Sequence, residues 1–196
     1  MLRTAILAAC TALALMAAGD PRAAVCRKKI DEIEAGRAKA SAVYLFTAAE
    51  INAYAREEIP TVVPKGLRNP ALELSSNTAI GSALMDFLQM QHAKGVSMNW
   101  LMERLLDGEH PVRAVIEAQT KDGRAIITLR RLEISGVAAS GTVLDFLIRN
   151  FFRPLYPNAH INEWFEMGNN IDHVDVLPGA VRVSIKAKLA PVRRGR

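Results

Sequence analysis

Residues 108–152 read GEHPVRAVIEAQTKDGRAIITLRRLEISGVAASGTVLDFLIRNFF, and this stretch decides the fold. Two runs rich in β-branched residues flank Asp122-Gly123, a pair that favours the positive φ angles of a type I′ hairpin turn. Apolar residues then recur with helical spacing at Val143, Leu144, Leu147, Ile148 and Phe151. The stretch therefore predicts a long β-hairpin followed by an apolar helix over 141–152.

The first 24 residues have the composition of a secretory signal peptide. Arg3 supplies a positive start, residues 5–18 are apolar, and small residues follow at 17–19 and 23–24. The apolar run is shorter than the about 20 residues that a membrane-spanning helix needs. We expect residues 1–24 to direct export to the periplasm. The alternatives are an uncleaved membrane anchor and a lipid anchor at Cys10 or Cys26.

Charge and cysteine content limit the class of protein. Removal of residues 1–24 lowers the net charge from +5 to +4, and the remaining charge is spread along the chain apart from a basic tail at 191–196. We expect that tail to be a solvated end, or to be attracted to anionic headgroups. A basic stripe with interleaved aromatic residues is missing, so nucleic acid is not an expected partner. With Cys26 as the remaining cysteine, an intramolecular disulfide is excluded and the core must hold the fold.

The rest of the chain reads as one α+β domain over 42–190, preceded by a charged spacer or short exposed helix over 25–41. Thr47 and Glu50 have the spacing of a capping box and predict a helix that runs to about Ile59. From Ala71 the residues alternate, with Leu72, Leu74, Ile80 and Leu84 in one set and small residues such as Ala79 and Gly81 in the other. Two strands joined near 76–77, or one long bent strand, fit this pattern. A second apolar helix is predicted over 98–106, and a closing hairpin over 171–176 and 181–188.

Motifs that carry catalysis or bind metals are missing. The four histidines, at 92, 110, 160 and 173, have no metal-ligand spacing among themselves. Ser135 and Ser140 are turn and cap serines outside any Gly-x-Ser-x-Gly frame, and no glycine-rich phosphate loop is present. Glu117 and Glu133 lie among arginines on the predicted hairpin and are interpreted as surface ion pairs. The sequence thus predicts a protein that is not an enzyme and has neither cofactor nor metal.

Apolar residues are in excess instead. The helices over 98–106 and 141–152 are apolar around most of their circumference, and four methionines, at 85, 90, 98 and 102, add adaptable surface. An ordinary core accounts for such faces, and so does a pocket for an acyl chain, which gains about 0.8 kcal/mol per buried methylene without any precise polar group. Sequence alone leaves both interpretations open.

The order of motifs resembles a known group of proteins. Residues 46–54 (FTAAEINAY) are similar to the helix start of small exported bacterial lipid-binding proteins. The hairpin motifs from Gly108 to Val137, then Arg153-Pro-Leu and residues 172–179 (DHVDVLPG), follow in the same order. The chain thus resembles the LmeA-like and YceB-like proteins of the tubular lipid-binding (TULIP-like) superfamily over about residues 42–188. This resemblance implies a strongly curved antiparallel sheet wrapped around a long helix, with a pocket for a phospholipid or isoprenoid lipid.

We therefore expect a periplasmic lipid-binding or lipid-carrier protein that makes peripheral membrane contact. The candidate lipid-binding residues are Ile51, Tyr54, Ile80, Leu84, Ile116, Leu129, Leu144, Leu147, Ile148 and Phe151. The candidate membrane-contact residues are Trp100, Leu101, Trp164 and Phe165, because amphipathic aromatic side chains suit the membrane interface. The alternative functions are an envelope assembly module that docks a protein through its apolar helix, and a hydrolase that uses Ser135 or Ser140.

Overall fold

The predicted hairpin lies at the centre of an antiparallel sheet. The structure is a computed structural model that describes residues 19–62, 65–94, 100–152 and 161–187. Strand β4 (Glu109–Lys121) pairs with β5 (Arg124–Ile134), and Lys121 lies opposite Arg124. Asp122 and Gly123 have φ angles of 52° and 76°, as the turn prediction requires. The central hairpin is confirmed.

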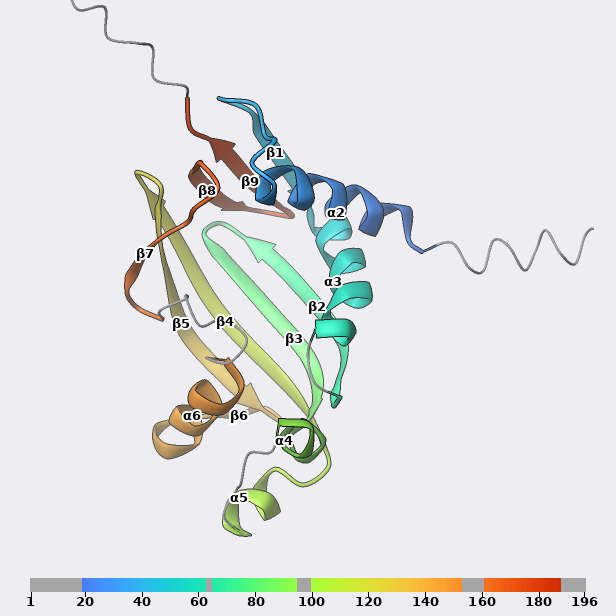
Figure 1. Cartoon of the computed structure of the whole chain (residues 1–196). Helices are drawn as coiled ribbons and strands as arrows, with labels where there is room; N and C mark the ends of the chain where they lie inside the picture. Colours follow the sequence, from blue (N-terminus) through green and yellow to red (C-terminus); the bar gives the residue numbers. More distant parts are fainter. Residues whose placement is uncertain (1–18, 63–64, 95–99, 153–160, 188–196) are drawn as a thin grey trace, which may run out of the picture.

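Three further strands and a short edge strand complete this large sheet, whose order is β2-β3-β4-β5-β6, with β7 also paired to β5 (Figure 1). All of its pairs are antiparallel. The bounds of the added strands are β2 (Leu67–Ser75), β3 (Thr78–Asp86), β6 (Val137–Ala138) and β7 (Trp164–Glu166). Ser75 pairs with Thr78, so the turn between β2 and β3 has two residues, one of which is Asn77 at a φ of 55°.

A second, smaller sheet has the order β1-β9-β8, formed by Val43–Thr47, Ala180–Ile185 and Ile171–Leu177. Its edge strand β8 is hydrogen-bonded to the hairpin ends of the large sheet. The backbone amides of Asn77 and Gly123 donate to the carbonyl oxygens of Val176 (2.9 Å) and Asp172 (3.0 Å). The Thr120 hydroxyl donates to the carbonyl of Val174 and accepts from its amide. The small sheet is thereby fixed across one end of the large sheet.

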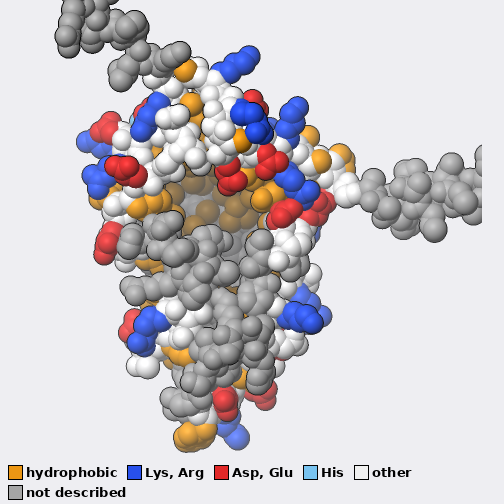
Figure 2. All heavy atoms as spheres, viewed as in Figure 1, with side chains coloured by type: hydrophobic (Ala, Val, Ile, Leu, Met, Phe, Trp, Pro, Cys, Tyr) orange, Lys and Arg blue, Asp and Glu red, His pale blue; other side chains and the backbone are white. Residues whose placement is uncertain are grey.

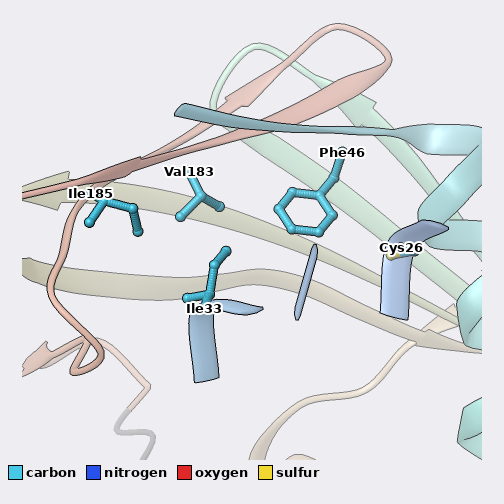
Figure 3. Packing of buried hydrophobic residues seen from close by; sticks show 5 residues of the cluster. All are labelled: Cys26, Ile33, Phe46, Val183 and Ile185. Carbon is cyan, nitrogen blue, oxygen red and sulfur yellow. The ribbon is translucent and has the colours of Figure 1, made fainter. Parts of the chain in front are cut away.

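Two helices pack on the small sheet. Helix α2 (Pro21–Glu34) and helix α3 (Ala48–Val62) contribute to a small-sheet cluster whose buried members are Cys26, Ile33, Phe46, Val183 and Ile185. Figure 3 shows the side chains of the strand residues directed towards the helix that carries Cys26 and Ile33. The capping box of α3 is confirmed, because the Glu50 amide donates to the Thr47 hydroxyl (3.2 Å) and the Thr47 amide donates to the Glu50 carboxylate (2.8 Å).

Helix α2 differs from the expectation of a signal peptide followed by an exposed spacer. The helix begins at Pro21 with Asp20 as its N-cap, and Ala23 and Cys26 are almost completely buried. In the full chain, residues 20–24, assigned from sequence to the leader, form the N-cap and first turn of α2, and residues 25–34 contribute Cys26 and Ile33 to the small-sheet cluster; cleavage of the leader stays a prediction. Lys, Arg, Asp and Glu dominate this stretch, which conceals the three small or apolar side chains that pack inward.

The opposite end of the large sheet carries α4 (Phe87–Lys94), α5 (Trp100–Leu105), α6 (Gly141–Leu147) and the π-helical turn η1 (Ile148–Phe152) (Figure 1). Phe87, Met90, Leu106 and Leu147 form a buried helix-end cluster. Helix α4 was not expected from the sequence, and the helix predicted over 141–152 changes from α to π after Leu147. Among the described helices, none is both long and apolar enough to cross a bilayer.

The chain thus folds as a single α+β domain with a large antiparallel sheet. The described helices lie along the β2 edge and at the two ends of that sheet in Figure 1. Two clusters of buried side chains, one at each end, form most of the core, and Ala79 and Ala125 of the large sheet are buried outside both clusters.

Candidate functional site

The two faces of the large sheet have opposite chemistry. Cross-strand partners share a face and successive residues alternate, so the register assigns the side chains except at two irregularities, residues 69–70 of β2 and residue 130 of β5. We call inner the face on which Val112, Leu132 and Ile134 pack against the helix-end cluster. Its members are Leu67, Leu72, Leu74, Ala79, Gly81, Ala83, Met85, His110, Val112, Ala114, Ile116, Ala118, Thr120, Ala125, Ile127, Leu129, Leu132, Ile134, Val137 and Phe165. None of these is Asp, Glu, Lys or Arg. The outer face carries the charged residues, such as Glu73, Arg113 and Glu133.

The apolar inner face is covered incompletely at its centre. Strand β4 has a partner strand on both sides, yet none of its 13 residues is buried. A Cβ atom built on Gly81, which lies beside Leu72 and Ala114, meets no atom of the described residues within 4 Å. Figure 2 shows a hollow over the large sheet, beside the small sheet, with hydrophobic side chains on its floor. A central strand of an ordinary core would have its apolar face sealed.

The size of the side chains shapes this surface. Ala79, Gly81 and Ala83 of β3, with Ala114 and Ala118 of β4, make a low strip along the two central strands. Leucines stand on both sides of the strip, from β2 and from β5. The result is an uncharged trough that runs along the strands.

Both ends of the trough are closed by the chain itself. At one end Val112 packs against the helix-end cluster, and at the other Thr120 is hydrogen-bonded to Val174 of β8. These two residues are eight positions apart on one strand, or about 27 Å, and the three inner positions between them, 114, 116 and 118, account for about 20 Å of that length. An extended acyl chain fills one leaflet of a bilayer over about 15 Å, so the space between the ends is long enough for such a chain.

The ten predicted lipid-binding residues are divided among several places. Ile116 and Leu129 lie opposite each other on the inner face. Ile80 and Leu84 lie on the outer face, where Leu84 lines an open groove of about 410 Å³ together with Arg113 and Glu133. The ten residues therefore do not line one common surface.

The helical members of that set whose side chains the structure describes lie outside the middle of the trough. Ile51 and Tyr54 of α3 pack against the small-sheet cluster. Leu147 is 6% exposed inside the helix-end cluster, while Leu144 and Ile148 are half-buried on α6 and η1. The side chain of Phe151 is outside the described part of the structure.

The position of Ile80 and Leu84 has a simple cause. Ser75 pairs with Thr78, so a two-residue turn separates the strands and even-numbered residues of β2 share a face with odd-numbered residues of β3. Leu72 and Leu74 therefore face inward with Ala79, Gly81 and Ala83. The sequence prediction carried a single alternation through the turn. It therefore placed Ile80 and Leu84 on the pocket face and assigned the small residues of β3 to the opposite face.

The predicted membrane-contact residues are also separated. Trp100 of α5 is 74% exposed and lies near the start of β4. Trp164 of β7 is 41% exposed, has the Arg124 guanidinium 5.9 Å from its ring centroid, and lies near the end of β4. Phe165, its neighbour, faces inward, and the side chain of Leu101 is outside the described part. Because β4 spans about 40 Å, the two tryptophans do not form one contact surface.

The structure pairs one histidine with one of the candidate serines. His110 Nδ1 lies 3.0 Å from Ser135 Oγ, and its Nε2 lies 3.0 Å from the carbonyl oxygen of Asp107. Because a carbonyl only accepts, Nε2 carries the proton and Nδ1 accepts from the serine hydroxyl. These bonds join the segment after α5, the start of β4 and the turn before β6. Among the described residues, no group of three His, Cys, Asp or Glu side chains could hold a metal ion.

Most ionisable groups with shifted pKa values lie around α2, β1 and α3; on the large sheet, the hydrogen bond to the Glu117 carboxylate raises the pKa of Arg130. Partial burial opposes ionisation of Glu50, but the Lys29 ammonium (2.9 Å) and the Thr47 amide outweigh it and lower the pKa of Glu50. Burial raises the pKa of the Cys26 thiol, and the nearby Glu50 carboxylate adds to the effect. Neither group borders the trough, so neither is a candidate for chemistry there.

Comparison of the chain with protein-family models, with curated proteins and with solved structures gives no match.

Proposed function

We propose that this protein binds the acyl chain of a lipid along the inner face of its large sheet and serves as a lipid carrier. The single observation that carries the proposal is the inner face of β4, which is uncharged and incompletely covered although the strand is central. The ligand is the chain of a phospholipid or an isoprenoid lipid, and the large sheet curves around it. The resemblance to exported lipid-binding proteins supports the same conclusion, with the periplasm as the location.

The energetics of such a site are favourable. Burial of about ten methylenes yields about 8 kcal/mol, which corresponds to a dissociation constant of about 1 μM before ordering costs. A charged headgroup finds no partner on the inner face and remains at the rim, where Figure 2 shows acidic and basic side chains above the hollow. Binding of this kind requires no catalytic group.

The alternative of a protein docked on the apolar helix has less support. Leu147, at the centre of that helix, is already buried against Phe87, Met90 and Leu106 of the same chain. The apolar surface that this alternative needs is thus used in part by the fold itself.

The decisive experiment compares two leucines placed on adjacent residues of β3. Gly81→Leu fills the trough, and its Cβ has free space, so we expect a folded protein. Ser82→Leu adds the same side chain to the outer face and is the matched control. Lipid is measured by native mass spectrometry of full-length protein purified from its own cells, and by uptake from vesicles of phosphatidylethanolamine and phosphatidylglycerol.

We expect the wild-type protein and Ser82→Leu to carry lipid, and Gly81→Leu to lose at least tenfold in uptake with an unchanged circular dichroism spectrum. Equal uptake by Gly81→Leu and Ser82→Leu would show that the trough is not the site. A wild-type protein that carries no lipid and brings a stoichiometric protein instead would favour the assembly alternative.

A further inference from the structure

We propose that the trough holds one acyl chain at a time and limits its length between two fixed ends. This inference rests on the lipid-binding function and adds to it the class of ligand and a residue that determines specificity.

The width of the low strip sets the number of chains. Ala79, Gly81 and Ala83 line the strip on β3, whereas their partners on β4 are Ile116, Ala114 and Val112. The strip is therefore two strands wide, or about 10 Å, at Gly81 and narrower on either side. Leu72 on β2 and Leu129 on β5 stand beside it. A second chain would have to lie on top of these leucines, without a floor of its own. The ligand is therefore a single-chain amphiphile, or one chain of a larger lipid.

The length is limited because both ends are built from ordered groups. The helix-end cluster is buried, with Phe87 and Met90 each 1% exposed, so it cannot yield without loss of core packing. At the other end, Val174 exchanges two hydrogen bonds with Thr120, and Asn77 and Gly123 add one each to β8. A chain longer than the space between these ends must bend out into water.

Ala83 is the residue that determines specificity. It lies opposite Val112, so its side chain is the last inner position of β3 before Met85 and the helix-end cluster. A larger side chain at this position moves the closed end of the trough inward by about one residue pair, so the space for the acyl chain becomes about 7 Å shorter. We expect Ala83→Leu to shorten the preferred chain, whereas Gly81→Leu blocks the trough in the middle.

The test measures the affinity of the full-length protein for laurate, myristate, palmitate, stearate and behenate by isothermal titration calorimetry. On an unlimited apolar surface the affinity rises about fourfold for each added methylene. We expect this rise in the wild type up to a maximum between myristate and stearate, with behenate bound at least tenfold more weakly than the optimum. Ala83→Leu should move the maximum to a shorter acid, and Ser82→Leu should leave it in place.

The outcomes separate the two proposals. A steady rise through behenate, or an optimum that is the same in Ala83→Leu and the wild type, overturns the length limit while lipid binding stands. A stoichiometry of two acids per protein overturns the single-chain site. If no acid binds to the wild type, the lipid-binding function itself fails. Should Ala83→Leu fail to fold, Ala83→Val, a smaller β-branched addition at the same closed end, provides the second test of a shortened optimum.

Discussion

Glu50 is the single residue that joins the most parts of the small-sheet region. Its carboxylate accepts from the Thr47 amide at the start of α3 and pairs with Lys29 of α2, whose ammonium also donates to the Leu45 carbonyl of β1 (2.7 Å). A helix, a strand and a second helix thus meet at one charge. Because the pKa of Glu50 is lowered in the folded protein, this carboxylate stabilises the fold only where it is ionised in the unfolded chain as well.

The pH dependence follows from that sign. The contribution of Glu50 is present above its ordinary pKa of 4.5 and is lost as the pH falls through the lower folded value. We expect Glu50→Gln to reduce the free energy of unfolding by about 0.5–1 kcal/mol near neutral pH, the range of partly exposed ion pairs. The difference should shrink towards zero in acid. Urea unfolding followed by tryptophan fluorescence measures it, with Glu73→Gln on the outer face of β2 as control; a deficit that is constant with pH would contradict the assignment.

At the scale of elements, α2 is the one whose role the sequence concealed. The outer side of α2 is charged, and only a few of its side chains face the small sheet. Those side chains are almost fully buried, as the 1% exposure of Cys26 shows. The buried thiol, with its raised pKa, is a reporter of whether the helix is docked.

We expect Cys26 to react with a maleimide at least a hundredfold more slowly in native buffer than in urea, because labelling requires α2 to leave the small-sheet cluster. Arg27→Ala removes the ion pairs of α2 with Glu57 and Glu58 of α3 and should accelerate native labelling. Lys28→Ala, which removes an exposed cation from the same helix, is the matched control. Fast native labelling of the wild type would mean that α2 is not held as described.

The elements that sequence predicted correctly are those specified by local chemistry. Asp122-Gly123 favours its own turn, Thr47 and Glu50 cap their own helix, and the strand after Gly179 alternates strictly. The features that were missed depend on partners distant in sequence. Cys26 is core only because Phe46 and Val183 cover it, and helix α4 is stabilised by packing of Phe87 and Met90 rather than by a periodic pattern.

The sequence predicts the kind of site that we propose, but most of the residues that it singled out are not those of the trough. The sequence shows an excess of apolar residues and a lack of catalytic motifs, which together favour a lipid ligand. The sequence prediction selected bulky residues such as Ile80 and Leu84. The trough is instead formed where the side chains are small, at Ala79, Gly81 and Ala83. A small residue in a predicted strand is equally compatible with a closely packed neighbour and with open space above it. The strand register is needed to tell which of the two applies.

At the scale of the whole molecule, two buried clusters hold the ends of a sheet whose middle lacks a sealed face. A ligand that occupies the middle should therefore stabilise the entire fold. With palmitate at a hundredfold excess over its dissociation constant, the linkage amounts to about 2.7 kcal/mol. We expect the melting temperature of the wild type to rise by several degrees with palmitate, as measured by differential scanning calorimetry. That of Gly81→Leu should not change, and an equal rise in both would place the ligand elsewhere.

Several side chains form hydrogen bonds with the backbone of the edge strands. These hydrogen bonds bear on the risk of aggregation in a protein with so much apolar surface. The Asn52 amide donates to the Leu72 carbonyl (2.8 Å) and accepts from the Leu72 amide (2.6 Å), as a neighbouring strand would do. On β1, Lys29 donates to the Leu45 carbonyl and Glu50 accepts from the Thr47 amide. On β8, the turns of the two hairpins of the large sheet donate to backbone carbonyls. Another extended polypeptide thus finds few backbone groups on which to add itself, and growth of a fibril from these borders is hindered.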